Sequence, residues 1–237
     1  SDLFGMNAAG TDAKMRNTKE SILEAQFTSG AGNWCTWMFG RDLVNWNNNF
    51  TWAKWVTPSR DLISAFKQEG DEVRFKESIV YYDCNWSNYY PSDNYPFMYK
   101  CRSANSSIIK YRYADVLLLK AEALIMQDTP DLEGAADIID KVRDRAKLGA
   151  LPTSVRSNKN VLLNALLKER RLELAFEGQR WFDLVRLDKV EEVMNAVYSK
   201  DSGRKAQIYT FDKNSYRLPI PQSVIDANDK IHQNPGY

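Results

Sequence analysis

The stretch ERRLELAFEGQRWFDLVR, residues 169–186, decides the fold of this chain, because it places long charged side chains among large apolar ones in a helix-rich region. The helix formers VLLNALLK precede it at 161–168. Leucines in both segments cover more than one stripe of a helix, so this helix must be contacted on two sides. Gly178 is placed to end the helix in a left-handed conformation, and QRWFDLVR predicts a second helix after it.

Three glutamates, Glu169, Glu173 and Glu177, are spaced four residues apart. Repulsion between their like charges destabilises a helix unless cations form ion pairs with them. The cations close to them in the sequence are Arg170, Arg171, Arg180 and Arg186. We interpret these residues as a lattice of Arg–Glu pairs that locks helices together. The alternative is acid–base catalysis by paired carboxylates, as in a glycoside hydrolase, and the many arginines argue against it.

Composition excludes several classes of protein. With 43% hydrophobic and 12% aromatic residues in 237 positions, the chain is globular. Its 32 basic and 31 acidic residues give a net charge of +1, so we expect neither nucleic acid nor an anionic membrane surface as a partner. No run reaches the roughly 20 apolar residues of a membrane span, and the first ten residues lack the features of a signal peptide, which predicts a mature or truncated product.

Histidine and cysteine usage limits the chemistry further. His232 is the only histidine of the chain, which excludes histidine-based triads within it and argues against a zinc site. No metal motif is present, and we expect neither a metal nor another cofactor. Cys84 and Cys101 bracket a tyrosine-rich loop and could pair in an oxidising compartment, whereas three free thiols, with Cys35 as the third, are equally compatible with the sequence.

From Tyr111 the sequence becomes regularly helical. RYADVLLLKAEALIMQ predicts a helix whose apolar face contains Tyr113, Val116, Leu117 and Leu124. Thr129-Pro130 is expected to cap and open a second helix, which ends near Gly149. The small residues Ala123 and Ala135 predict close packing of the two helices in a tetratricopeptide-type hairpin.

Other segments complete the expected architecture. Helices around 158–177 and 179–197 are the stacking partners of the hairpin, a helix over 58–70 has a proline in its first turn, and 19–28 and 73–82 predict short strands. The predicted fold class is mainly α, with tetratricopeptide-like helical hairpins, long irregular aromatic-rich loops and a few short strands.

The loops are rich in aromatic and amide side chains. Six of the seven tryptophans lie between positions 34 and 86, and six of the twelve tyrosines between 81 and 99, among many asparagines. Flat aromatic surfaces with amides at their edges suit the apolar faces and polar rims of sugar rings. The alternative is that these aromatics form the loops' own core, which we favour for any single one of them. The candidate ligand-binding residues are Trp46, Trp52, Trp34, Trp55, Asn48 and Tyr90.

Three blocks carry a resemblance to a known family: YRYADVLLLKAEALI at 111–125, ERRLELAFEGQRWFDLVR at 169–186, and YRLPIPQSVIDANDKIHQNPGY at 216–237. In this order they resemble the C-terminal half of the SusD/RagB family of outer-membrane nutrient-binding lipoproteins from Bacteroidetes. TPSRDLISAFKQEGDEVRF at 57–75, with Asp71 and Arg74, resembles a further family segment.

The resemblance implies a non-catalytic glycan-binding protein on the extracellular face of the cell outer membrane. Its partners would be a glycan ligand and a SusC-like TonB-dependent transporter, and its only membrane attachment a lipid anchor in a missing N-terminal half. We expect residues 1–237 to form a single SusD-like C-terminal region, in which 1–110 is loop-rich and ligand-facing and 111–237 contains the helical scaffold and a C-terminal strap. A glycoside hydrolase using the three glutamates and a repeat adaptor that binds only protein are the alternatives.

Overall fold

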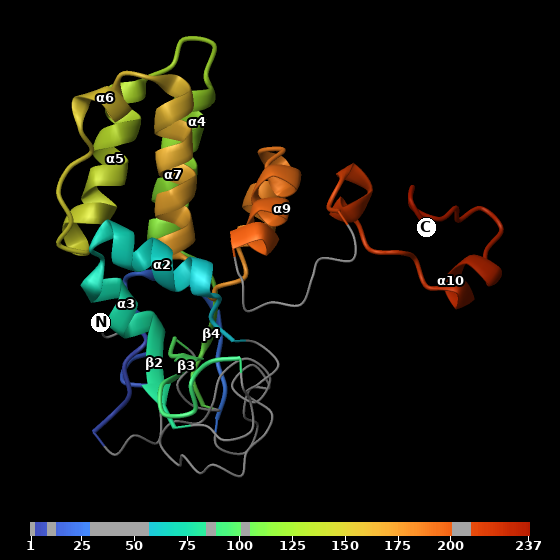
Figure 1. Ribbon diagram of the computed structural model, residues 1–237, viewed down its shortest axis with the longest axis horizontal. Coiled ribbons are helices and arrows are strands. Elements are labelled where there is room, and N and C mark those ends of the chain that lie inside the picture. Colours follow the sequence, from blue (N-terminus) through green and yellow to red (C-terminus); the bar gives the residue numbers. More distant parts are fainter. Residues whose placement is uncertain (1–2, 9–12, 29–56, 84–88, 101–104, 201–209) are drawn as a thin grey trace. The chain divides into compact units, whose positions relative to one another are not determined.

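A computed structural model describes these segments of the chain: residues 3–8, 13–28, 57–83, 89–100, 105–200 and 210–237 (Figure 1). Contacts divide the chain into two compact units, residues 1–179 and 180–237. Helices predominate in the described segments, and the strands are few and short. The predicted mainly α fold class is confirmed.

Three long helices form the scaffold of the first unit (Figure 1). α4 (Tyr113–Met126) and α5 (Leu132–Arg145) pack side by side as a hairpin, and α7 (Lys159–Glu173) lies against both. The short α6 (Thr153–Arg156) contacts α5 and α7. The structure therefore contains the predicted tetratricopeptide-like hairpin together with one of its predicted stacking partners.

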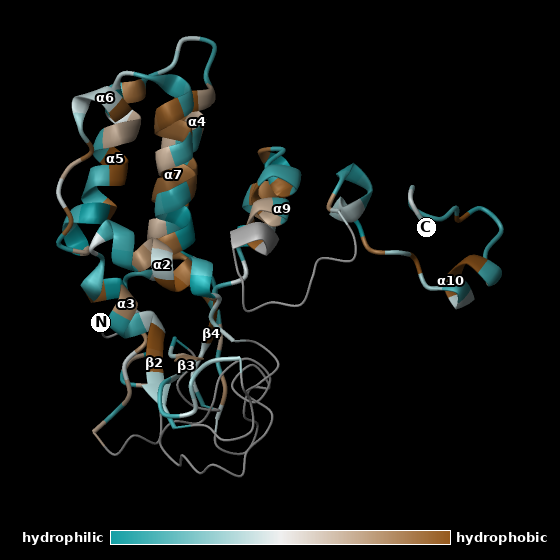
Figure 2. Cartoon of the chain, in the orientation of Figure 1, coloured by the Kyte–Doolittle hydropathy of each residue, from teal (hydrophilic) through white to brown (hydrophobic). Residues whose placement is uncertain are grey.

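The core between these helices is apolar, and Figure 2 shows apolar residues alternating with polar ones along α5 and α7. Its fully buried side chains are Leu118, Ala121, Ile125, Ala135, Ala136, Ile139, Leu162 and Leu166. The predicted face of α4 is partly wrong, because Tyr113, Val116 and Ala123 are exposed while Ala121 is buried. α4 is apolar around most of its circumference, so the periodicity of its sequence does not identify the side that packs.

α2 (Arg60–Glu69) confirms the helix predicted over 58–70, with one shift at its start. Pro58 lies before the helix rather than in its first turn, and the Ser59 hydroxyl caps the helix by accepting a hydrogen bond from the Leu62 backbone N–H at 3.1 Å. The helix ends at Gly70, whose φ of 69° is the left-handed conformation that glycine adopts without steric cost.

The strand predicted over 73–82 is wrong for its first residues. α3 (Glu72–Ser78) comes first, and the strand β2 (Ile79–Tyr82) contains only the remaining residues. The helix forms because the Asp71 carboxylate accepts a hydrogen bond from the Arg74 backbone N–H at 3.1 Å and so satisfies a donor of the first turn.

Helix boundaries also differ from the predictions later in the chain. α5 begins after Asp131, whose carboxylate accepts from Gly134, and not at Thr129-Pro130. α7 ends at Glu173, because both Phe176 (φ 66°) and Gly178 (φ 81°) adopt left-handed backbone conformations that a right-handed helix cannot contain. The left-handed conformation predicted for Gly178 is confirmed, within a turn rather than at the helix end.

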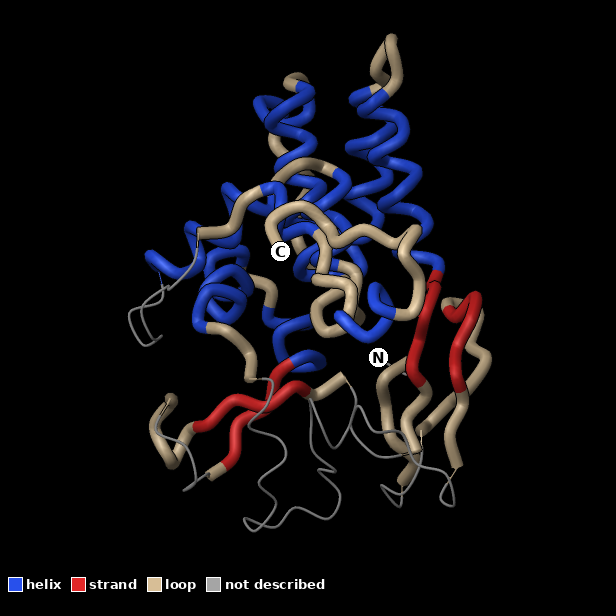
Figure 3. The backbone as a smooth tube through the Cα atoms, turned by 90° about the vertical axis from the view of Figure 1, so that its right-hand side faces the viewer, coloured by secondary structure: helices blue, strands red, loops and turns tan. Residues whose placement is uncertain are grey.

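The strands of the first unit form two separate antiparallel ribbons (Figure 3). β1 (Ser21–Ala25) pairs with β4 (Ile108–Arg112), which leads directly into α4. β2 pairs with β3 (Tyr95–Met98) in a regular register from Ile79 opposite Met98 to Tyr82 opposite Tyr95. Both ribbons bring side chains from distant segments of the sequence toward the end of α7.

The second unit consists of short elements. α8 (Arg180–Arg186) and α9 (Val190–Lys200) replace the single helix predicted over 179–197, with Asp188 between them in a left-handed conformation (φ 53°). A 3-10 helix, η3 (Lys213–Tyr216), and α10 (Gln222–Asp226) follow.

The C-terminal tail is held to itself by side chains. The Gln233 amide donates to the Ile220 carbonyl at 2.9 Å and accepts from the Ile220 N–H at 2.8 Å. The Tyr237 hydroxyl donates to the Arg217 carbonyl at 3.2 Å. These bonds fix the extended path that Pro219 and Pro221 impose on the tail.

Candidate functional site

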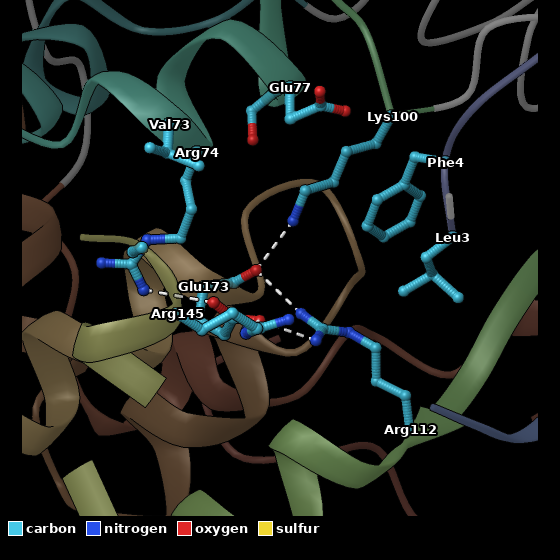
Figure 4. A pocket seen from close by; sticks show the side chains of 11 residues that line it. Leu3, Phe4, Val73, Arg74, Glu77, Lys100, Arg112, Arg145 and Glu173 are labelled. Carbon is cyan, nitrogen blue, oxygen red and sulfur yellow. Dashed lines mark hydrogen bonds and ion pairs between the residues drawn. The ribbon is translucent and has the colours of Figure 1, made fainter. Parts of the chain in front are cut away.

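The three spaced glutamates lie at the end of α7 and in the turn after it, and each forms ion pairs with basic side chains. Glu169 accepts from Arg74 at 2.5 Å and from Arg143 at 3.4 Å. Glu173 accepts from Arg112 at 2.7 Å and Arg74 at 3.1 Å, and also from Arg145. These ion pairs, which we call the charge lattice, confirm that the glutamates have structural partners, and Figure 4 shows the part of the lattice around Glu173.

Glu177 extends the charge lattice beyond the helix. Its carboxylate accepts from Lys100 at 2.6 Å and from Nε of Arg112 at 2.6 Å. Lys100 and Arg112 also donate to the Glu173 backbone carbonyl, at 2.7 and 2.9 Å, and so satisfy an acceptor at the helix end. The left-handed turn at Phe176 brings Glu177 back toward these cations, and the Phe176 ring packs on the apolar cluster around Leu172.

Three of the four arginines that the sequence suggested as partners of the glutamates pair with other carboxylates. Arg170 instead pairs with Asp115 at 2.8 Å, Arg171 with Asp61 at 2.5 Å, and Arg186 with Asp183 at 2.7 Å. The cations that form ion pairs with the three glutamates come from α3, β4, α5 and the residues after β3. They are Arg74, Arg112, Arg143, Arg145 and Lys100. Sequence proximity was therefore the wrong guide to the pairing.

Burial and charge set the protonation states in the charge lattice. Burial alone would raise the pKa of Glu173, but the surrounding cations, Arg112 foremost, outweigh it and hold the pKa well below its usual range. Glu177 has a lowered pKa for the same reason, through Lys100 and Arg112. At Glu169 burial prevails over its arginine partners and raises the pKa. Glu173 and Glu177 are thus held in the ionised state, which does not suit a general acid.

An aromatic cluster lies at the β2–β3 ribbon and includes the candidate residue Tyr90. Its ring makes edge contacts with Tyr89, at 4.9 Å between centroids, and with Tyr95, at 5.6 Å. The Arg60 guanidinium lies over both Tyr89 and Tyr90, 4.0 and 4.6 Å from their centroids. The Tyr90 hydroxyl donates to the Pro58 carbonyl at 2.8 Å. Tyr90 is therefore packed and hydrogen-bonded within the chain, and its ligand-binding role stays a prediction.

The other candidate ligand residues lie outside the described residues. They are Trp34, Trp46, Asn48, Trp52 and Trp55, and the same holds for Cys35, Cys84 and Cys101. Thr57 is the first described residue after 29–56, and it hydrogen-bonds to the Tyr95 hydroxyl at 3.0 Å. Tyr89 is the first described residue after 84–88. Both of these residues belong to the aromatic cluster or contact it.

Metal ligands and membrane-spanning helices are the two remaining kinds of feature that bear on function. Within the described segments, no group of three or more histidine, cysteine, aspartate or glutamate side chains is arranged to hold a metal ion. Among the helices described, none combines the length and the apolar character that crossing a bilayer requires.

Several site residues escaped the sequence analysis. Lys100 lies in no motif, Arg112 lies in the family block 111–125 but was given no role, and Arg145 was not identified as a partner of the glutamates. The sequence gives no signal that separates Arg112 from its charged neighbours Lys110 and Asp115. In the structure Arg112 is 1% exposed, whereas Lys110 is exposed.

Comparison with known proteins supports the fold and the family. The sequence model of the SusD family matches residues 93–237. SusD-like protein P2 of Formosa agariphila is 36% identical over 143 residues, which are 57% of this chain and 27% of that protein. SusD-like protein P38 of the same organism is 43% identical over 99 residues, which are 39% of this chain and 19% of that protein.

Solved structures share the fold. A SusD-like protein from Bacteroides fragilis NCTC 9343 has a TM-score of 0.71 at 20% identity, over 97% of this chain and 56% of that one. A laminarin-binding SusD-like protein has a TM-score of 0.55 at 23% identity, over 98% of this chain and 48% of that one. The chain spans about half the length of these solved relatives and less than a third of the two curated ones.

The sequence model covers more than half of the chain, including β3, β4, the helical scaffold with the three spaced glutamates, and the C-terminal tail. The structural match extends over nearly all of it. This chain belongs to the SusD family.

Proposed function

We propose that this chain belongs to a non-catalytic glycan-binding protein on the outer face of the outer membrane. It would pass its ligand to a SusC-like TonB-dependent transporter and be attached to the membrane by a lipid anchor outside the residues present here. The observation that carries the proposal is the match of the scaffold to the SusD family. One relative with the same fold is named for laminarin binding, which makes glycans the first ligand class to test.

In this proposal the glycan binds to the tryptophan-rich segment 34–55, which belongs to the loop-rich region of residues 1–110. Residues 111–237 serve as the scaffold. Trp46 and Trp52 are the first candidates, because they flank three consecutive asparagines whose amides can donate to and accept from sugar hydroxyls. Thr57, which follows this segment in the sequence, hydrogen-bonds to Tyr95 of the aromatic cluster at 3.0 Å, so the chain is attached to a packed scaffold immediately after the proposed binding segment.

The charge lattice supports a binding protein over the hydrolase alternative. A hydrolase requires one carboxylic acid that is protonated before the reaction and a second, ionised carboxylate. Glu173 and Glu177 are kept ionised by several cations each, and Glu169 is 2% exposed and bonded to Arg74. All three side chains already have structural hydrogen-bond partners.

The test is calorimetry of the full chain against an array of oligosaccharides, followed by single variants that remain folded. Trp46→Ala or Trp52→Ala should weaken glycan binding by at least about 2 kcal/mol, because a few aromatic anchors dominate such interfaces. Phe182→Ala is the matched control, since Phe182 is an exposed aromatic side chain outside the segment. If truncation of Trp34, Trp46, Trp52 and Trp55 one at a time leaves affinity unchanged, the glycan site lies elsewhere.

The same array separates the alternatives. Release of sugar products that Glu173→Gln abolishes would establish a hydrolase and overturn the binding-only proposal. Absence of any glycan binding, together with capture of a purified transporter barrel, would favour a protein-binding adaptor. Glycan binding without product release, in a complex with the transporter, is the expected result.

A further inference from the structure

The aromatic cluster joins two distant points of the chain. Thr57 directly follows residues 29–56, and its hydroxyl lies 3.0 Å from the hydroxyl of Tyr95. Tyr89 directly follows residues 84–88, and its ring packs against Tyr90 within the same cluster. One packed group of side chains therefore holds the chain at both points.

Further contacts connect the same two points, and most of them involve Arg60, the first residue of α2. Its Nη2 donates to the Tyr89 carbonyl, and its guanidinium lies 4.0 Å from the ring centroid of Tyr89 and 4.6 Å from that of Tyr90. The Tyr90 hydroxyl donates to the Pro58 carbonyl at 2.8 Å. Arg60 thus binds both the ring and the backbone of the residue that follows 84–88.

The base of the cluster is buried. Tyr95 is 1% exposed and Phe97 is 2% exposed, and their ring centroids are 5.2 Å apart. Tyr95 also pairs with Tyr82 across the β2–β3 ribbon and contacts the Tyr90 ring at 5.6 Å. Residues on both sides of 84–88 therefore meet at Tyr95, which is a rigid point of attachment because it lies in a packed core.

The helical position of Arg60 is unfavourable for its charge. The positive end of the helix dipole lies at the N-terminus, so a cation in the first turn lowers the stability of the helix. Asp61, the next residue of α2, carries the favourable sign. Attraction between the guanidinium and the two tyrosine rings offsets the cost at Arg60. The stabilising contacts of Arg60 are thus with the aromatic cluster and not with its own helix.

We propose that Arg60 is a positioning residue for the glycan site. It rests on the proposed function, because segment 34–55, the proposed glycan-binding segment, ends shortly before Thr57. By holding Tyr89 and Tyr90, Arg60 keeps the cluster that anchors Thr57 in one arrangement. Residues attached to a rigid support bind a ligand more tightly, because less conformational freedom is lost on binding.

Loss of positioning has its own kinetic signature. When only a fraction of the molecules is in the binding-competent arrangement, the apparent affinity falls by that fraction. The fall appears in the association rate, because a ligand that has bound the competent arrangement leaves it as before. Loss of a direct contact with the ligand raises the dissociation rate instead. The two rates therefore distinguish a positioning residue from a contact residue.

The test measures both rates on the full chain by stopped-flow fluorescence, with the oligosaccharide that binds best in the array. Arg60→Met keeps an unbranched side chain but removes the charge and the hydrogen-bond donors. It should lower the association rate about three- to thirtyfold, the effect of losing a cation–π contact, and leave the dissociation rate unchanged. Arg60→Lys, which keeps a cation over the rings, should restore most of the association rate.

Two further variants make the comparison specific. Arg171→Met is the matched control, because Arg171 pairs at 2.5 Å with Asp61, the neighbour of Arg60 on α2, and this ion pair lies outside the aromatic cluster. It should leave both rates unchanged. Thr57→Val removes the hydrogen bond to Tyr95 while keeping the shape of the side chain, and it should slow association as Arg60→Met does. Thermal unfolding of each variant verifies that it is folded.

Three results in the variants would overturn the proposal. One is an unchanged association rate in Arg60→Met. A second is a raised dissociation rate with an unchanged association rate, which would make Arg60 a glycan contact. The third is equal slowing in Arg171→Met, which would reveal a general effect on α2. Absence of glycan binding by the original chain would overturn the proposed function and this proposal together, and it is seen before any variant is made.

Discussion

Glu173 is the residue on which most ion pairs of the charge lattice converge. It is 4% exposed and accepts from Arg74, Arg112 and Arg145. Glu173→Ala should lower the free energy of unfolding by about 3–5 kcal/mol, because it leaves buried cations without their counter-charge. Urea denaturation followed by circular dichroism measures this change.

Glu72→Ala is the control for this prediction. Glu72 forms an exposed i, i+4 pair with Lys76 at 3.5 Å, and such surface pairs contribute little to stability. The variant should unfold at nearly the same urea concentration as the original chain. An equal loss of unfolding free energy in Glu173→Ala and Glu72→Ala would show that the buried ion pairs of Glu173 stabilise the chain no more than an exposed pair does.

Two glutamates one turn apart should respond to acid in opposite ways. The pKa of Glu173 is lowered in the folded chain, so its ionisation contributes stability that is present above the ordinary pKa of 4.5 and lost as pH falls through and below that value. The pKa of Glu169 is raised in the folded chain, so its ionisation lowers the stability of the fold at pH values above 4.5.

Stability measured from pH 7 down to pH 3 tests this difference. Glu173→Gln should flatten the decline in stability below pH 4.5, because it removes a group that the unfolded chain protonates first. Glu169→Gln should leave that decline in place or make it steeper. Identical pH profiles for the two variants would contradict the assigned directions of the pKa shifts.

The acidic half of the charge lattice could be predicted from sequence only in part. Glu169 and Glu173 lie one turn apart on α7, as their spacing predicts, but the helix ends at Glu173 and the left-handed turn at Phe176 places Glu177, so the prediction of three carboxylates on one helix face is wrong. The cationic half could not be predicted. Arg74 and Arg112 lie 99 and 61 residues from Glu173, and local spacing carries no information about such pairs. The ligand-binding prediction for Trp46 and Trp52 remains untested, since both lie outside the described residues.

At the scale of single elements, α4 shows where sequence patterns lose their power. Its apolar residues surround the helix, so they fit several packing faces equally well. Contacts with α5 and α7 determine which face of α4 is buried: Ala121 lies in the core and Ala123 is exposed. The short α3 illustrates a different limit, because a cap at Asp71 outweighed the β-forming residues that follow it.

The packing face of α4 can be tested with a pair of alanines. Ala121→Leu should destabilise the chain by about 1–3 kcal/mol, because it forces a larger side chain into a fully buried position between helices. Ala123→Leu, two positions along the same helix, should change stability little because its side chain is exposed. Thermal unfolding of both variants measures the difference, and a reversed order would mean that the predicted face was right after all.

At the scale of the whole molecule, the overall class was the most predictable property. Regular helical periodicity from Tyr111 and the three family blocks were sufficient for a mainly α fold of the SusD family, which the match over 93–237 bears out. The organisation of the first 110 residues was less predictable. Its two ribbons join segments that are distant in sequence, such as β1 with β4, and their pairing depends on the folded scaffold.

The charge lattice also has a consequence for the lifetime of the folded state. Its bonds join residues separated by 61, 95 and 99 positions in the sequence. Closing such long loops lowers the entropy of the chain before the ion pairs can form and stabilise it. We therefore expect these bonds to form after the main folding barrier, so that Glu173→Ala speeds unfolding, by up to about three orders of magnitude, while folding slows little. Stopped-flow measurements in both directions test this, and a proportionate slowing of folding would contradict it. Where cleavage by a protease is faster than refolding, the rate of unfolding sets how long each copy of a protein survives.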